Sequence, residues 1–278
     1  MKISVIIPTF NRLDLLKRAI DSVLNQSIKP YDIIVVDDGS IDDTSEMIQH
    51  KYKSINLIQQ KNSGVSAARN NGIKNAQGDW IALLDSDDEW GKNKLEEQVN
   101  NLTDNPKYEF CHTNEIWIRN GIRVNQKKRH KKYGGFIFDK CLDICRISPS
   151  SVLFNKNILN HVGWFDEKLP VCEDYDLWLR ITADYEILFI DKPLIVKYGG
   201  HNDQLSNSVE AIERFRIKAL QSLLENSDLS KNNRIHAIEM IIKKLNIYLK
   251  GLVKRKKHDE AKKVAEKIKV WNKDMFEY

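Results

Sequence analysis

The stretch IALLDSDDEW, from Ile81 to Trp90, is decisive for the fold class because it changes abruptly from apolar to acidic. Its first four residues are apolar and typical of a buried strand. Asp85, Asp87 and Asp88 follow at once, so three carboxylates occupy four positions. Carboxylates this close together repel one another and resist ionising together. A bound divalent cation would relieve that repulsion, and the stretch therefore predicts a buried strand that ends at a metal site.

Strand and helix patterns alternate on both sides of this stretch through the first hundred residues. Continuous apolar runs predict strands in KISVIIP, YDIIVVDDG, NLIQQ and DWIALLD, and helical spacing of apolar residues predicts helices between them. Such alternation is typical of a parallel sheet covered by helices on both faces, where ligands bind beyond the carboxyl ends of the strands. The segments just past the four strands are all polar: PTFNR, DDGS, QKNSG and DSDD. They predict one crevice along one edge of the sheet.

The rest of the chain divides into an irregular middle and a helical end. Residues 107–118 predict a strand that pairs with the sequence after Gly121, and further strands and helices follow up to residue 198. Beyond Leu205 there is almost no Gly or Pro, and the pattern predicts helices over about 206–226, 230–253 and 257–271. We therefore expect one α/β domain over residues 1–203 and a helical C-terminal extension over residues 204–278.

Composition excludes several classes of protein. The net charge of +5 is modest and is not by itself evidence for a nucleic-acid partner. No stretch approaches the roughly 20 apolar residues of a membrane helix. The N-terminal MKISVIIPTF lacks the long apolar segment and cleavage site of a signal peptide, so we expect a cytoplasmic protein. The four cysteines form no CxxC pair, which favours reduced structural thiols over zinc ligands.

Two acidic strand ends suggest chemistry, although each also has a structural interpretation. DSD can reach one Mg²⁺ or Mn²⁺ and leave positions for phosphate oxygens, but acidic residues after a strand also cap helices or remain solvated. VVDDGS, from Val35 to Ser40, is either a helix-capping turn or a carboxylate that binds a nucleobase or ribose. Arg69 is either a solvated cation or a clamp on nucleotide phosphates.

Five segments together resemble family 2 glycosyltransferases with the GT-A fold: IIPTFNR, VVDDGSIDDT, NSGVSAARNNG, DWIALLDSDD and CEDYDLWLR, in the order seen in that family. The resemblance covers about residues 2–200. It implies a Rossmann-like, mostly parallel central sheet with a donor nucleotide half over 1–105 and an acceptor half over 106–203. It also implies metal-dependent, inverting transfer of a sugar from a nucleotide-diphosphate donor to an acceptor hydroxyl. UDP is the commonest donor nucleotide in the family, while dTDP and GDP stay open.

The resemblance implies a role for each matched residue. Asp174 would be the catalytic base, with Glu173 beside it on the acceptor side; Asp87 would be the direct ligand of Mn²⁺ or Mg²⁺, with Asp85 reaching the metal or the ribose. The residues implied to bind the donor are Pro8, Thr9, Asn11, Asp38, Arg69, Asp85 and Ser86. An inverting displacement needs these two kinds of carboxylate, because the acceptor hydroxyl loses a proton while the leaving diphosphate gains charge.

Four further features have weaker support. His201, after the last predicted strand, resembles a metal-ligating histidine of some family members but is equally a loop residue, and Trp164 resembles a residue on the acceptor side but is equally a core residue. The loop QKKRHKKYGG is either a mobile element that closes over an anionic substrate or a solvated basic segment. The Lys-rich helices between Lys250 and Lys269 predict either contact with an anionic membrane surface or a dimer or packing element.

Two alternatives to a glycosyltransferase remain open at this point. A sugar-phosphate nucleotidyltransferase has a similar sheet but resembles its relatives in a Gly-rich loop after the first strand, which PTFNRLDLL lacks. A non-catalytic nucleotide- or glycan-binding module would keep the sheet without needing both the metal pair and the base. The acceptor stays open among a glycan, a lipid-linked oligosaccharide, a protein and a small molecule.

Overall fold

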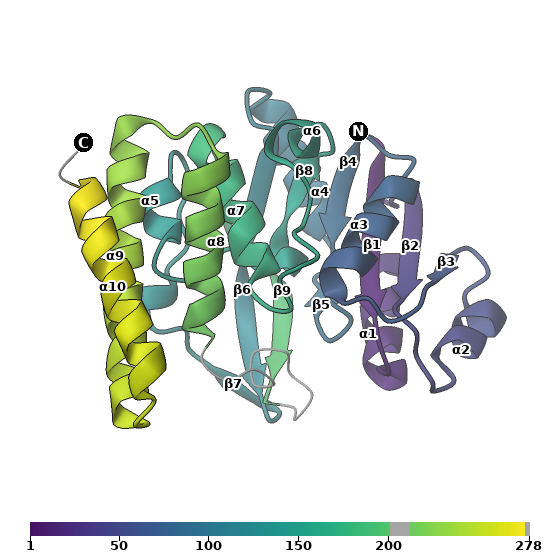
Figure 1. Cartoon of the computed structure of the whole chain (residues 1–278). Coiled ribbons are helices and arrows are strands. Elements are labelled where there is room, and N and C mark those ends of the chain that lie inside the picture. Colours follow the sequence, from purple (N-terminus) through teal and green to yellow (C-terminus); the bar gives the residue numbers. More distant parts are fainter. Residues whose placement is uncertain (201–211, 276–278) are drawn as a thin grey trace.

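Four parallel strands form the first half of the sheet in the computed structural model, which describes residues 1–200 and 212–275 (Figure 1). Their spatial order is β3-β2-β1-β4, which is the order of a doubly wound sheet. The strands are β1 (Ile3–Thr9), β2 (Asp32–Asp37), β3 (Asn56–Gln59) and β4 (Trp80–Leu83), and the helices between them are α1 (Leu13–Leu24), α2 (Thr44–Lys51) and α3 (Val65–Asn75). The predicted alternation of strand and helix is confirmed.

The second half of the sheet mixes parallel and antiparallel pairs. β8 (Leu153–Asn155) is antiparallel to β4 and to β6 (Phe110–Arg119), while β6 and β9 (Leu188–Gly199) run parallel. Two short strands lie at the margins, β5 (Glu89–Trp90) against β9 and β7 (Ile122–Val124) against β6. The helical elements here are α4 (Lys94–Asp104), η1 (Lys128–His130), α5 (Phe138–Cys141), η2 (Pro149–Ser151), α6 (Ile158–Val162) and α7 (Glu173–Asp184).

Every residue of β1 is buried. Since successive side chains of a strand point to opposite faces, both faces of the sheet are covered at β1. Ile6 packs in one core with residues of α3 and α7, and Val5 and Ile7 pack in a second core with residues of α1. This arrangement explains why the strands have continuous apolar runs rather than alternating ones. The α/β fold class predicted from those runs is confirmed.

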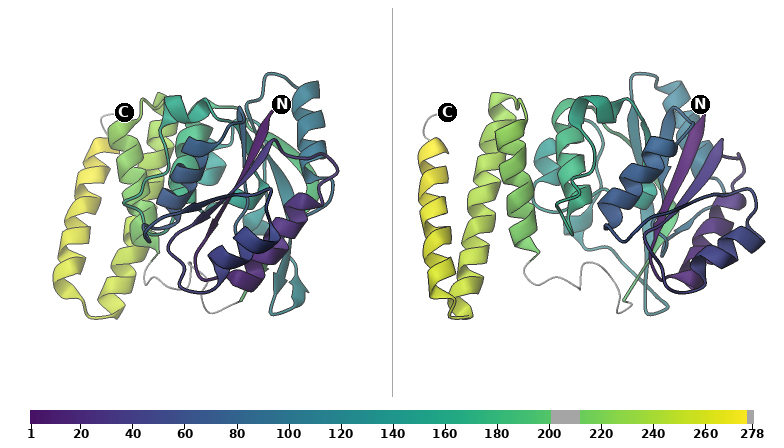
Figure 2. Two further views of the ribbon diagram at one scale, coloured as in Figure 1. Left: turned by 90° about the vertical axis from the view of Figure 1, so that its right-hand side faces the viewer. Right: turned by 45° about the vertical axis from the view of Figure 1, so that its right-hand side comes forward.

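Three helices follow the sheet and stack outward from α7: α8 (Glu213–Asn226), α9 (Lys231–Lys254) and α10 (His258–Met275) (Figures 1 and 2). Ser230 caps α9 by accepting a hydrogen bond from the backbone N–H of Asn233 at 3.2 Å. The apolar faces of these helices continue the core that contains α3 and α7. The predicted helical extension is therefore present, although its predicted start near 204–211 falls outside the described residues.

None of the helices in residues 1–200 and 212–275 has the length and apolar character needed to span a bilayer. The exposed apolar residues of the last two helices, Ile247, Val253 and Val270, are scattered singly. Membrane contact and dimerisation through these helices therefore stay predictions.

The carboxyl ends of the parallel strands meet at one edge of the sheet, as predicted. Thr9 is in register with Asp37, and Asp37 is in register with Gln59. The polar segments after β1, β2 and β3 therefore begin at the same level, and the acidic turn after β4 lies next to them.

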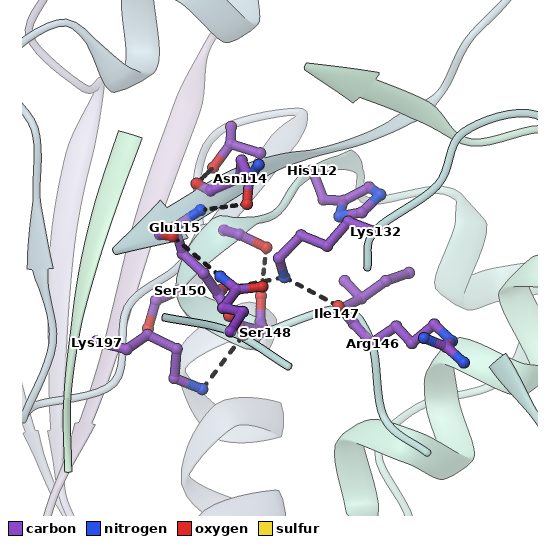
Figure 3. Close-up of polar contacts among 12 residues, drawn as sticks. His112, Asn114, Glu115, Lys132, Arg146, Ile147, Ser148, Ser150 and Lys197 are labelled. Atoms are coloured by element: carbon purple, nitrogen blue, oxygen red, sulfur yellow. Dashed lines mark hydrogen bonds and ion pairs between the residues drawn. The ribbon is translucent and has the colours of Figure 1, made fainter. Parts of the chain in front are cut away.

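Lys132, in the basic loop QKKRHKKYGG, forms a buried ion pair with Glu115 instead of facing solvent (Figure 3). The Lys132 side chain is 2% exposed, and its Nζ lies 3.1 Å from Glu115 Oε2 and donates to Arg146 O at 2.9 Å. Trp117 Nε1 donates to the other carboxylate oxygen of Glu115 at 2.7 Å. The prediction of a solvated or mobile loop is thus wrong at Lys132, because a buried carboxylate partner anchors it to β6.

Burial and charge in this network act on two titratable groups. Burial would raise the pKa of Glu115, but Lys132 and Lys197 outweigh it and lower that pKa to about 2. Burial, reinforced by the charge of Lys132, lowers the pKa of His112 to about 3. His112 is therefore neutral in the folded state and donates from Nε2 to Tyr133 O at 2.9 Å.

The buried His112 should make stability depend on pH. Its pKa is lower in the folded state than its ordinary value of 6.5, so the unfolded chain binds the extra proton and stability falls as pH drops from 6.5 towards 3. The substitution His112→Gln removes the titrating imidazole and with it this pH-dependent loss of stability. In urea unfolding at pH 7.5, 6 and 5, the free-energy advantage of wild type over the variant should shrink by up to about 1.4 kcal/mol per pH unit. An advantage that is independent of pH would contradict this account.

Two helical glycines should respond in opposite ways to alanine. A Cβ at Gly72 in α3 would overlap Ile6 Cγ2 and lie 3.1 Å from Val36 Cγ2, so Gly72→Ala should destabilise by about 1–3 kcal/mol. A Cβ at Gly251 in α9 would meet only the mobile end of Arg255 at 3.3 Å, so Gly251→Ala should stabilise by up to about 1 kcal/mol. Urea unfolding of both variants measures the two changes in the free energy of unfolding. Equal changes would show that the close approach of α3 to β1 does not require glycine at position 72.

Candidate functional site

A cavity of about 780 Å³ opens at the carboxyl edge of the sheet. Its wall combines the polar segments after the first-half strands with the start of α7, the end of β9 and the start of α8. Ten of the predicted site residues line it: Pro8, Thr9, Asn11, Asp38, Arg69, Asp85, Ser86, Asp87, Glu173 and Asp174. The volume lies within the range typical of ligand pockets.

Two predicted site residues are not placed in this cavity. Trp164 is not part of its wall; its ring packs against the core and its backbone oxygen accepts a hydrogen bond from Arg180 at 2.8 Å. Its neighbour Phe165 is buried, and an acceptor-side role for Trp164 stays a prediction. His201 lies outside the described residues, as does the predicted domain boundary near residues 203 and 204.

Asp38 organises the end of the cavity nearest β2. One of its oxygens accepts from Gln60 Nε2 and the Ser63 backbone N–H, and the other from the Gly64 backbone N–H, each at 2.8 Å. A carboxylate has about four lone-pair positions, so these bonds leave capacity for one further donor. The adjoining Gly39 has a φ of +83°, and a Cβ there would lie 2.9 Å from Asn62 N. Only glycine therefore fits this turn.

The loop after β1 contributes a second set of polar groups. Asn11 accepts from the Ile41 backbone N–H at 2.8 Å, and its own N–H donates to Ser40 Oγ at 2.8 Å. These two bonds tie the loop after β1 to the loop after β2. The Thr9 hydroxyl is buried and has no hydrogen-bond partner within residues 1–200 and 212–275. An orphaned hydroxyl in a cavity wall is available to a ligand.

Arg69 joins the two halves of the site. Its Nη2 lies 2.7 Å from Asp85 Oδ1 and its Nη1 lies 2.6 Å from Glu173 Oε1, with the side chain 4% exposed. Burial opposes its charge, but the two carboxylates outweigh that effect and raise the pKa of Arg69. Burial and the adjacent Asp174 raise the pKa of Glu173 to about 7, despite the ion pair with Arg69.

The acidic turn after β4 presents three carboxylates on one side. Asp85, Asp87 and Asp88 each place one oxygen within 4.8 Å of the others. The Asp88 backbone N–H donates to Asp85 O at 3.0 Å, which closes the turn and gathers the side chains. Burial beside Asp85 and Asp87 raises the pKa of Asp88 well above its ordinary value. A close-packed set of carboxylate oxygens suits Mg²⁺ or Mn²⁺, so the residues fit such an ion.

Side chains from other elements hold this turn in place. Arg12 Nη1 lies 3.1 Å from Asp87 Oδ2, and Ser150 Oγ donates to Asp88 Oδ2 at 2.6 Å. Lys197, on β9, donates to Ser148 Oγ at 3.2 Å and extends the network around Glu115 to the cavity (Figure 3). Burial would lower the pKa of Lys197, but Asp88 and Glu115 raise it.

Asp174 faces the same cavity and is held in a different way. One oxygen accepts from the Tyr175 backbone N–H at 2.7 Å, and the other accepts from the Cys145 thiol at 3.3 Å. Burial and the charge of Asp174 raise the pKa of the Cys145 thiol well above its ordinary value, so the thiol stays protonated, and its one hydrogen is shared between Asp174 and Ile147 O, also at 3.3 Å. Cys172, just before α7, has a φ of +66°, an uncommon conformation for a residue with a side chain.

Several cavity residues were not predicted. Asp88 belongs to the acidic run that sequence analysis singled out, and its position three residues after Asp85 was a usable signal. Lys197, Arg216, Cys145 and Cys172 also line the cavity. Cys172 begins the quoted segment CEDYDLWLR, so that motif was a usable signal. No motif marks the other three residues, since they reach the site only through the packing of β9, α8 and the segment before η2.

Comparison with known sequences agrees with this geometry. The sequence model described as "Glycosyl transferase family 2" matches residues 4–163. An uncharacterized glycosyltransferase of Rickettsia conorii is 39% identical over 200 residues, which are 69% of this chain and 32% of that protein. An uncharacterized glycosyltransferase of Rickettsia felis is 38% identical over 200 residues, which are 69% of this chain and 32% of that protein. This chain thus spans about a third of the length of these two relatives.

A relative from Escherichia coli matches over more of its own length. It is named UDP-Glc:alpha-D-GlcNAc-diphosphoundecaprenol beta-1,3-glucosyltransferase WfgD, and it is 33% identical over 192 residues. The match covers 68% of this chain and 73% of the relative. This share makes it a relative over most of both sequences.

Solved structures with the same fold include S. aureus TarS 1-349 in complex with UDP-GlcNAc. The TM-score is 0.69 at 22% identity, and the match covers 88% of this chain and 72% of that one. At this identity the likeness establishes the fold alone. The matched sequence model and the E. coli relative go further: the chain belongs to glycosyl transferase family 2, and its fold is the GT-A fold of that family.

Proposed function

We propose that this protein is a metal-dependent, inverting glycosyltransferase that moves a sugar from a UDP-sugar donor to the hydroxyl of an acceptor. One observation carries the proposal: a single cavity brings the carboxylate cluster after β4 together with a separate carboxylate, Asp174, at the start of α7. Family membership supports the reaction class. The two halves of the chain, 1–105 and 106–203, would then supply the donor and acceptor sides.

The donor nucleotide would lie against the ends of β1 and β2. Asp38 has capacity for one further hydrogen bond and suits a base or ribose donor. The orphaned Thr9 hydroxyl, with Pro8 and Asn11 beside it, offers polar and apolar contacts in the same wall. UDP is favoured because the E. coli relative is named for UDP-Glc and the TarS structure contains UDP-GlcNAc.

The diphosphate would lie at the acidic turn. Asp85, Asp87 and Asp88 would hold Mn²⁺ or Mg²⁺, which neutralises the charge that develops on the leaving nucleoside diphosphate. Arg69 orients Asp85 by pairing with it at 2.7 Å. Arg12 orients Asp87 in the same way at 3.1 Å.

Asp174 would act as the general base. The acceptor oxygen attacks the anomeric carbon, its proton passes to Asp174, and the bond from that carbon to the diphosphate breaks. The Tyr175 N–H and the Cys145 thiol orient the carboxylate, one on each oxygen. Glu173 is committed to Arg69 and so positions the pair rather than taking the proton.

The chemical class of the acceptor stays open among a glycan, a lipid-linked glycan and a protein. The main alternative function is a nucleotide-binding module without activity. Such a module would not need Asp174 in the same cavity as the carboxylate cluster, and that placement favours the enzyme.

The metal-dependent donor site is tested by thermal unfolding with UDP, GDP, dTDP and CDP, each with and without Mn²⁺. At about a hundred times its dissociation constant, UDP with Mn²⁺ should stabilise wild type by about 2.7 kcal/mol, a rise in Tm of roughly 5 °C. Asp87→Asn should lose this shift, while Asp104→Asn, an exposed residue at the end of α4, should keep it. Equal shifts in Asp87→Asn, or shifts without metal, would contradict the metal role.

The base is tested separately from donor binding. Asp174→Asn should keep the shift with UDP and Mn²⁺ but lower turnover by about 10²–10⁴-fold, because general bases contribute on that order. Turnover is measured as UDP released from UDP-glucose or UDP-GlcNAc. The control is Asp184→Asn, an exposed residue at the end of the same helix. If Asp174→Asn retains full turnover, a different group takes the proton.

A further inference from the structure

The first turn of α8 forms part of the cavity wall. Ile212 and Arg216 line the cavity together with Cys172 and Asp174 at the start of α7. Glu213, the ion-pair partner of Arg216, also pairs with Lys244, whose Nζ lies 5.8 Å from the centroid of the Tyr175 ring, next to Asp174 in sequence. Arg216 therefore lies on the α7 side of the cavity, where Asp174 is. It also lies beyond residues 4–163, the part of the chain that matches the family.

Arg216 belongs to a cluster in which two cations share one carboxylate. Arg216 Nη1 pairs with Glu213 Oε1, and Lys244 Nζ on α9 lies 3.1 Å from Glu213 Oε2. The Lys244 side chain is 4% exposed, and its Nζ lies 5.8 Å from the centroid of the Tyr175 ring. Within residues 1–200 and 212–275, neither cation pairs with a second carboxylate. The cluster of Glu213, Arg216 and Lys244 thus has a net charge of +1.

An unsatisfied donor accompanies this charge. Arg216 Nε is buried and donates to no acceptor in the part of the chain that the structure describes. Lys244, by contrast, completes its bonding by donating to Asp143 O at 2.7 Å. A buried guanidinium N–H without an acceptor is costly, and an oxyanion is the ligand that a guanidinium fork binds best.

The donor diphosphate is a poor candidate for this oxyanion. The proposed metal site and its cations, Arg12 and Arg69, already supply positive charge at the acidic turn. Arg216 instead lines the cavity together with Cys172 and Tyr175, which flank the proposed base on α7. A cavity of about 780 Å³ has room for a second group beside the donor.

We propose that Arg216, supported by Glu213 and Lys244, binds an oxyanion carried by the acceptor, close to the hydroxyl that faces Asp174. The acceptor would then be anionic, with a phosphate or a carboxylate near the reacting hydroxyl. The proposal rests on the proposed function, since it takes Asp174 as the base. It makes the helical extension a part of the acceptor site rather than a packing element alone.

The test measures binding of small anions to protein saturated with UDP and Mg²⁺, so that the donor end is filled. Glycerol 3-phosphate and glucuronate are titrated by calorimetry, with glycerol as the uncharged control. Wild type should bind at least one of the anions and not glycerol. Arg216→Gln should weaken that binding at least about 10-fold, the size expected for a lost charged hydrogen bond. The preferred anion distinguishes a phosphate from a carboxylate.

Three variants separate binding from a structural role. Arg214→Gln, an exposed residue on the same turn of α8, should leave anion affinity unchanged. Glu213→Gln removes the neutralising charge and should tighten anion binding, whereas Lys244→Met should weaken it. A purely structural ion pair would make both substitutions destabilising without opposite effects on affinity. Circular dichroism and UDP binding confirm that each variant is folded.

Three results would overturn the proposal. Wild type could fail to bind either anion, Arg214→Gln could weaken binding as much as Arg216→Gln, or Arg216→Gln could lower affinity for UDP, which would place the residue at the donor end. Failure of the proposed function looks different, because wild type would then either bind no UDP or bind it without releasing UDP from UDP-glucose or UDP-GlcNAc.

Discussion

The double ion pair of Arg69 is the interaction on which the rest of the site depends. This one buried side chain contacts Asp85 after β4 and Glu173 at the start of α7, which are far apart in sequence. Breaking a buried pair leaves an uncompensated charge, so the two carboxylates require Arg69 and Arg69 requires them. The end of the parallel half of the sheet is thereby fixed against α7, and the cavity between them takes its shape.

That constraint separates two groups of carboxylates with different surroundings. The cluster after β4 is close-packed and is balanced by Arg12 just before α1, Arg69 on α3 and Lys197 on β9. Asp174 is held by a backbone N–H and a thiol, which orient it without adding positive charge. A metal site needs the first environment and a proton acceptor needs the second, so the electrostatics of the wall match the proposed division of roles.

Sequence reasoning predicted the parts of the site that follow from local pattern. Continuous apolar strands imply a parallel sheet, and parallel strands bring Thr9, Asp38 and Asp85 to one edge. Lys132 was misjudged because a basic run indicates solvent exposure unless its buried partner, Glu115, is known. Arg216 could not be predicted at all, since its place depends on how α8 packs on α7. Trp164 packs against the core and is partly buried, so its acceptor-side role stays a prediction.

The order in which the chain is synthesised gives the position of β9 a further consequence. The Tyr198 backbone N–H donates to Asp88 Oδ1 across 110 residues of sequence, and Lys197 beside it supplies positive charge to the same carboxylate. A ribosome therefore completes Asp88 long before the β9 groups that balance it, although Arg12 and Arg69, the partners of Asp87 and Asp85, are already present. Until β9 emerges, the nascent N-terminal half has one carboxylate at its sheet edge without these partners, which disfavours its burial. Closure of the site is thus coupled to completion of the second half, and the first half alone is not a finished binding unit.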